Sequence, residues 1–359
     1  MKLQHLFFLF LIIGLSPACE NESNTPEPCS SKFDQASLFT NVADNLILPA
    51  YKELQQNTNA LSDATTAFVQ APSDDNLAAL QQVWRDAYLV WQSAEPYNFG
   101  PAEAELLRSS LNNYPVNVDA IADNLEAGTW NLDAVDTYDK GFPALDYLLF
   151  GTADAVNFFQ NNPTALQYLT DVVEQIKSKT DNTLKAWQGD YRATFIANTG
   201  TADGTALSQI VNSLNENYEN IKRNKIGVPS GVVALGIPFP ESVEARFSRI
   251  SLELTKKALE VSKNYFQGGE GVGLDDYLNE INAEKGDELL TDVINSQYDL
   301  AAAELEKIEG PLQVAVEEQN EQVVEAYKTV STQVVHLKAD MTSVLCVEIT
   351  YIDNPSDSD

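Results

Sequence analysis

One short segment holds the residues whose types and spacing could do chemistry. Residues 141–151 read GFPALDYLLFG and place Pro143 and Asp146 three positions apart. Residues with this spacing lie on one face of a helix, where a nitrogen ligand and a carboxylate could converge on one metal ion or one water. Pro143 has no atom that binds a metal or carries a proton, whereas Asp146 retains a carboxylate. Because proline and aspartate are also common in a first helical turn, we favour a structural interpretation of the pair.

Histidine and serine offer little further chemistry. Beyond the N-terminal leader the chain has one histidine, His336, without a His-Glu-x-x-His motif around it, so a structural role is expected. Ser230 stands between Pro229 and Gly231 with no nucleophile-elbow pattern. Ser230 and Arg246 are better candidates for binding an anion or carboxylate, the alternatives being a loop hydroxyl and a surface ion pair.

The N-terminus has the pattern of a bacterial lipoprotein. Lys2 precedes an apolar run over residues 6–13, and Leu-Ser-Pro-Ala-Cys closes it at Cys19. We therefore predict a signal peptide over 1–18, a lipid on Cys19 and a tether over 19–33, which would hold the protein at the outer membrane. The polar and acidic segment 20–23 (Glu-Asn-Glu-Ser) resembles the export tags of some Bacteroidetes surface lipoproteins. No later apolar run approaches the length of a membrane span.

Charge and cysteine usage narrow the partners and the compartment. The net charge is −31, which argues against nucleic acid as a partner because such a surface repels phosphates. Cys29 and Cys346 remain once Cys19 is lipidated, an even pair in an oxidising compartment. They either form a disulfide or are two unrelated thiols.

Apolar residues recur at intervals of three and four, which predicts helices almost throughout. The clearest stripe covers 80–91, and the other predicted helices cover 45–54, 166–187, 243–265, 289–305 and 314–337. Residues 232–235 are the one candidate extended piece. A segment rich in Gly, Thr and Asn at 197–205 predicts a boundary between an N-terminal bundle (34–196) and a C-terminal bundle (206–352), followed by a tail (353–359).

Residues 141–151 also resemble the Gly-x-His-x-x-Glu signature of imelysin-like proteins. Gly141 is in place, Pro143 stands at the histidine position, and Asp146 stands at the glutamate position. Other segments resemble the family in the same order along the chain: 80–101, a tryptophan-bearing helix that ends in Glu95 and a Phe-Gly-Pro turn; 225–231 and 244–248, an interdomain region; and 337–351.

The resemblance implies an all-α protein of two helical bundles packed side by side, with a pocket between them that the signature helix borders. The expected pocket residues are Glu95, Gly141, Pro143, Asp146, Ser230 and Arg246. Glu95 and Asp146 are the best pair for an oxygen-only site for Fe³⁺ or Ca²⁺. A blander interpretation makes Glu95 a helix-terminating residue before Pro96.

The family is classed as zinc peptidases and is associated with iron or haem acquisition at the bacterial envelope. With Pro143 at the histidine position, we expect a binding or accessory lipoprotein that does not catalyse a reaction. Iron is the one cofactor that the resemblance suggests, and the expected partner is a TonB-dependent receptor or another envelope protein. Two alternatives stay open: a metallopeptidase with a rearranged metal site, and a structural partner of an outer-membrane receptor.

Overall fold

Several of the long helices begin where a capping residue precedes an apolar stripe. We describe a computed structural model, covering residues 32–234 and 236–351. In α3 (Asp74–Ala94), Ser73 caps the N-terminus by accepting a hydrogen bond from the Asn76 amide, and two aspartates in the first turn suit the helix dipole. The predicted stripe, including Trp84 and Trp91, is buried. Glu95 and Pro96 then turn the chain into η2 (Glu95–Tyr97), a 3₁₀ turn.

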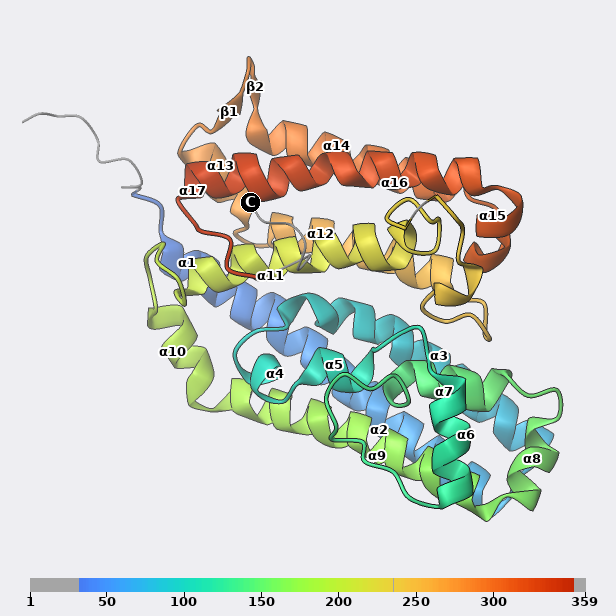
Figure 1. Cartoon of the computed structure of the whole chain (residues 1–359). Helices are drawn as coiled ribbons and strands as arrows, with labels where there is room; N and C mark the ends of the chain where they lie inside the picture. Colours follow the sequence, from blue (N-terminus) through green and yellow to red (C-terminus); the bar gives the residue numbers. More distant parts are fainter. Residues whose placement is uncertain (1–31, 235, 352–359) are drawn as a thin grey trace, which may run out of the picture. The chain divides into compact units, whose positions relative to one another are not determined.

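The first half of the chain forms one group of helices, in which α3 packs on α2 and α2 packs on α9 (Figure 1). Its helices are α1 (Gln35–Asn41), α2 (Leu48–Gln70), α3, α4 (Pro101–Ala104), α5 (Leu107–Leu111), α6 (Val118–Ala127), α7 (Gly141–Phe150), α8 (Ala155–Asn161), α9 (Pro163–Ala186) and α10 (Arg192–Ala197).

The second half forms the other group, in which α14 packs on α16 and on α12. Its helices are α11 (Ala206–Asn220), α12 (Ser251–Gln267), α13 (Leu274–Glu280), α14 (Leu290–Glu306), α15 (Leu312–Glu318), α16 (Asn320–Val334) and α17 (Thr342–Leu345). A two-residue hairpin pairs β1 (Glu284–Lys285) with β2 (Glu288–Leu289), Glu284 opposite Leu289. A further 3₁₀ turn, η5, covers Pro240–Ser242.

Several long helices contain π-helical turns, in which the backbone hydrogen bonds span one residue more than in an α-helix. These turns are η1 (Val42–Ile47), η3 (Trp187–Tyr191), η4 (Ile221–Gly227) and η6 (Val335–Met341). η4 continues α11 and carries Lys225, a residue of the site described below.

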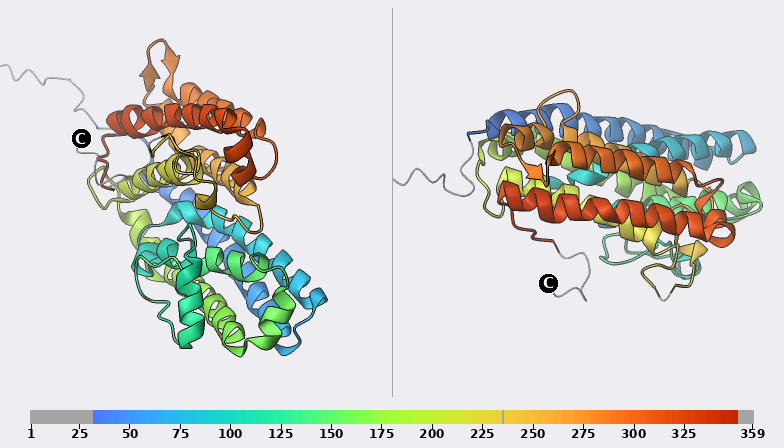
Figure 2. Two further views of the ribbon diagram at one scale, coloured as in Figure 1. Left: turned by 45° about the vertical axis from the view of Figure 1, so that its right-hand side comes forward. Right: turned by 90° about the horizontal axis from the view of Figure 1, so that it is seen from above.

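The two groups share one apolar core. Buried residues of both groups belong to a single contiguous cluster, and α12 packs directly on α3. The view from above in Figure 2 shows the long helices of both groups running in the same general direction. The expected all-α fold of two helical bundles packed side by side is therefore confirmed. The boundary at 197–205 falls in the connection between α10 and α11, and the domain limits remain a prediction.

Three local predictions of secondary structure were wrong. The helix predicted over 314–337 is interrupted at Gln319, which has a non-helical backbone (φ −134°, ψ 32°). The helix predicted over 243–265 begins only at Ser251, because residues 243–250 turn irregularly and Arg249 has a left-handed backbone (φ 66°). The described part of the predicted extended piece, Val232 to Ala234, is a turn.

Several predictions concern residues outside the described part of the chain. The signal peptide, Cys19, Cys29 and the tail from 353 onward lie there. Cys346 is disulfide-bonded. Its partner is not among the described residues, so the pairing with Cys29 stays a prediction. Among the described residues, no helix is both long enough and apolar enough to cross a membrane.

Candidate functional site

A buried charged network joins the two groups of helices. Lys225 Nζ donates hydrogen bonds to Glu244 Oε2 at 2.6 Å and to Gln92 Oε1 at 2.9 Å. Both charged side chains are almost fully buried. Asn112 Nδ2 donates to the other oxygen of Glu244 at 2.8 Å. A buried ion pair is stable only when further hydrogen bonds satisfy its remaining atoms, and Gln92 and Asn112 provide them.

Glu95 lies beside this network but is bound more loosely. Its Oε2 is 3.9 Å from Lys225 Nζ, its Oε1 is 3.8 Å from Arg108 Nε, and Asn112 Nδ2 approaches Oε1 at 3.5 Å. Burial raises the pKa of Glu95, and the attraction of Lys225 and Arg108 only partly opposes this. Glu95 therefore takes up a proton more readily than an exposed glutamate.

Asp146 holds a loop in place. Its side chain is buried, its Oδ2 accepts a hydrogen bond from the Phe247 amide at 2.9 Å, and its Oδ1 accepts one from the Ser248 amide at 2.8 Å. Asp146 is the sixth residue of α7, so the expected first-turn position was wrong. The carboxylate acts on another segment of the chain and not on its own helix terminus.

Burial raises the pKa of Asp146 to about 6 despite these hydrogen bonds. Because the folded pKa lies above the unfolded value of 3.8, the folded state binds the proton more tightly. The contribution of Asp146 to stability is therefore greatest below about pH 4 and falls as the pH rises towards 6. The shift corresponds to roughly 3 kcal/mol.

Gly141 lets α7 approach α5 closely. Its φ is +71°, and a Cβ atom there would lie 2.3 Å from the Leu111 carbonyl oxygen. The next residue, Phe142, stacks on Tyr88 with 4.8 Å between ring centroids and accepts a hydrogen bond from Trp84 Nε1 through its carbonyl. The start of the signature helix is thus fixed against α3 and α5, and only glycine fits at position 141.

Residues 244–249, which we call the crossing segment, connect the Lys225 network with Asp146. Glu244 at one end enters the network of Lys225, and the amides of Phe247 and Ser248 bind Asp146. The Arg246 guanidinium lies 4.5 Å from the centroid of the Phe247 ring. The segment is therefore anchored both to η4 and to α7.

The six residues predicted to line a pocket are only partly brought together. Glu95 adjoins the Lys225 network, whereas Asp146 and Arg246 meet at the crossing segment. Ser230 is buried in a separate turn, where its hydroxyl donates to the Gly227 carbonyl at 3.2 Å. None of the six, Gly141 and Pro143 included, lines any of the three hollows described below among the described residues. Their role in ligand binding stays a prediction.

Comparison with known proteins shows which family the chain belongs to. The sequence profile of the family described as Imelysin matches residues 47–339, which is most of the chain.

The chain belongs to the imelysin family. This imelysin is 24% identical over 244 residues to "Iron-regulated protein A" of Synechococcus elongatus, a match that spans 64% of each chain. Two solved structures share its fold. One is a Parabacteroides distasonis protein assigned as an iron-regulated protein A precursor (TM-score 0.73, 21% identity, 88% of this chain and 97% of that one). The other is an imelysin-like protein from Psychrobacter arcticum (TM-score 0.69, 21% identity, 89% and 97%).

The signature of this imelysin does not fit a metal ion. Both oxygens of Asp146 accept backbone N–H groups, and Glu95 lies between the cations Lys225 and Arg108, which would repel a metal. His336 lies elsewhere, 3.0 Å from Asp340 Oδ2. Within the described residues, no three His, Cys, Asp or Glu side chains are arranged to hold a metal.

Lys225 and Glu244 were missing from the predicted site. Both belong to the segments that resemble the family, but lysine and glutamate are common surface residues and nothing in their spacing marks them as partners. One signal was available: Lys225 is one of only 22 basic residues against 53 acidic ones, and it stands next to the apolar pair Ile226 and Val228. A lysine in such a context is a candidate for a buried ion pair.

Proposed function

We propose that this imelysin is a lipoprotein of the outer membrane that binds a ligand or partner, without catalysis, in iron or haem acquisition. One observation carries the non-catalytic part of the proposal. Pro143 stands at the signature's histidine position, and the Asp146 carboxylate is committed to the amides of Phe247 and Ser248. The signature helix thus supports the crossing segment and leaves no ligand set for a hydrolytic metal.

The link to iron is supported by the relatives. One relative is named for regulation by iron, and a solved structure with the same fold carries the same assignment. The membrane location is supported by the pattern that ends at Cys19. A TonB-dependent receptor or another envelope protein is the partner that fits this location.

The iron link can be tested in the organism that carries the chain. We expect a deletion strain to grow more slowly than the parent under iron limitation and to recover when an iron salt is added. The wild-type gene should restore growth, whereas Cys19→Ser should restore it poorly because the protein is released from the membrane. Equal growth of the deletion and parent strains under iron limitation would overturn the iron proposal.

The absence of catalysis is tested separately on the purified mature chain. We expect no cleavage of casein or of a mixed peptide library with Zn²⁺, Fe²⁺ or Ca²⁺ present. Metal-dependent cleavage that disappears in Asp146→Ala, but persists in the surface control Lys328→Gln, would establish the peptidase alternative instead.

A further inference from the structure

A long groove runs along α12, on the side where it meets α3 and α14. The main hollow has a volume of about 940 Å³, within the range of small-molecule sites. Two smaller hollows continue it: one of about 210 Å³ shares Arg85 and Ile250 with it, and one of about 280 Å³ shares Lys257 and Asn264. The walls of the main hollow include the apolar residues Leu252, Leu259 and Leu305.

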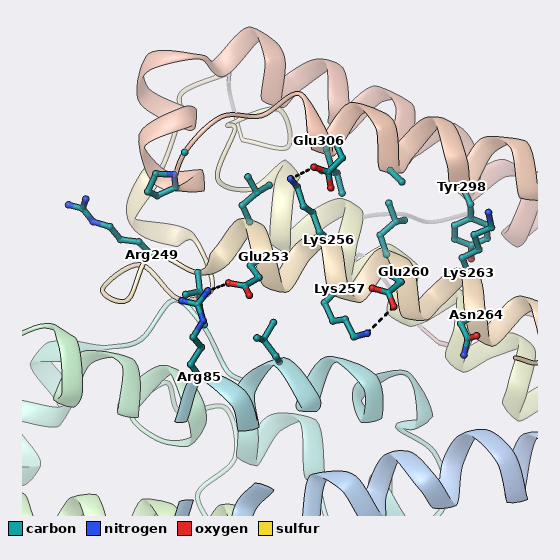
Figure 3. A pocket seen from close by; sticks show the side chains of 18 of the residues that line it. Arg85, Arg249, Glu253, Lys256, Lys257, Glu260, Lys263, Asn264, Tyr298 and Glu306 are labelled. Carbon is teal, nitrogen blue, oxygen red and sulfur yellow. Dashed lines mark hydrogen bonds and ion pairs between the residues drawn. The ribbon is translucent and has the colours of Figure 1, made fainter. Parts of the chain in front are cut away.

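The charge of the groove is opposite to that of the chain. Five of its lining residues are cationic and three are acidic, in a protein with a net charge of −31. The cations are Arg85, Arg249, Lys256, Lys257 and Lys263. Figure 3 shows them spread along the groove, with Arg249 at one end and Lys263 at the other. An anion entering this groove meets local attraction on a surface that is otherwise repulsive.

The lysines have partners that a ligand can replace. Lys256 Nζ lies 2.8 Å from Glu306, Lys257 Nζ lies 2.9 Å from Glu260, and Lys263 Nζ lies 2.5 Å from Asp299. In each pair the acidic side chain is 70% exposed, whereas the lysine is only 29–34% exposed. Exposed pairs of this kind contribute little stability, so an acid can turn into solvent while its lysine stays at the wall.

One cation at the groove has no side-chain partner among the residues that the structure describes. The Arg249 side chain makes no hydrogen bond or ion pair with the described residues, and its backbone has the unfavourable φ of 66°. Such backbone strain persists only where the surroundings impose it. The neighbouring Ser248 amide is held by Asp146, so the signature helix fixes the wall of the groove that carries Arg249.

We propose that this groove binds an amphipathic organic anion, with a carboxylate, sulfonate or phosphate group on the lysines of α12 and an apolar body against the leucines. This inference rests on the proposed function, because that function includes the binding of a ligand. The binding measurement below does not depend on iron or on growth, so the two proposals can fail separately.

A matched pair of fluorescent probes tests the site. The mature chain is titrated with 1-anilinonaphthalene-8-sulfonate and with its uncharged analogue N-phenyl-1-naphthylamine. We expect saturable one-to-one binding of the sulfonate, at least tenfold tighter than that of the neutral probe and weaker at high salt. The double variant Lys256→Gln/Lys257→Gln should weaken sulfonate binding at least tenfold and leave the neutral probe unaffected.

Two further variants separate the groove from other causes. Lys328→Gln removes a lysine of α16 that lies 3.0 Å from Glu325 and does not line the groove, so sulfonate affinity should stay unchanged. Ala302→Phe adds a ring at an exposed wall position, where folding is tolerant, and should block both probes. Equal affinity for both probes, or sulfonate binding that survives all three groove substitutions, would overturn the proposal. A dimer of the wild type that Ala302→Phe dissolves would likewise overturn it, and assign the groove to a second copy.

Discussion

Replacing Lys225 by methionine tests whether the buried network holds the two groups of helices together. Methionine has nearly the same length and volume as lysine, so the change removes the charge and its hydrogen bonds with little change in packing. Glu244 then loses its 2.6 Å ion pair, and its two remaining hydrogen-bond donors, Gln92 and Asn112, are neutral. Removing one partner of a buried pair costs about 3–5 kcal/mol, and we expect a loss of that size in the free energy of unfolding.

The assay is urea unfolding at pH 7, followed by circular dichroism, with two companion variants. Lys225→Met/Glu244→Gln leaves no unpaired charge at the pair and should recover roughly 1–3 kcal/mol of the loss. Lys328→Met, at an exposed pair, should change stability by less than about 1 kcal/mol. A loss below about 1 kcal/mol for Lys225→Met, or no recovery in the double variant, would refute the reasoning.

Three further predictions concern the signature helix and the N-terminus. The wild-type free energy of unfolding should decline between pH 4 and pH 7, and Asp146→Asn should remove roughly 3 kcal/mol of that decline. Urea unfolding across this pH range measures it. An unchanged slope of the free energy of unfolding against pH would mean that Asp146 does not titrate near 6. Gly141→Ala should cost about 2–4 kcal/mol because its Cβ would meet the Leu111 carbonyl, whereas Gly128→Ala, with a similar φ but open space, should cost about 1–2. Cys19→Ser should abolish incorporation of radiolabelled palmitate, and continued labelling would refute lipidation at that position.

Sequence periodicity predicted the helices whose stability comes from their own apolar stripe. The stripe of α3 and the bounds of α14 follow from local spacing, and the structure confirms the stripe and, to within one residue, the bounds. The same periodicity failed over 243–250. There the Ala245 amide donates to Ser251 Oγ, and the Phe247 amide donates to Asp146, so contacts with other parts of the chain decide the backbone.

The site was less predictable for a related reason. Asp146 could be selected because the signature marks its position. Its partners are backbone amides about 100 residues away, and amides carry no mark in a sequence. The pairing of Lys225 with Glu244 depends on which way Lys225 faces at the end of a long helix. The extra residue in the π turn of that helix changes the direction in which Lys225 points.

The π-helical turn η4 therefore determines which way the side chains at the end of this helix face, and so which of them reach the interface between the two groups of helices. A π turn holds about one residue more than an α-helical turn, so the same residues wound as a regular α-helix would follow a different path around the helix axis. Without the π turn, side chains beyond it would be rotated by about 100° about the helix axis relative to their present positions. Lys225 would turn away from Glu244 even though no atom of either side chain had changed. In this protein the count of residues before the lysine matters as much as the lysine itself, so alignments that shift a gap across 221–227 will misassign the charge that joins the two bundles.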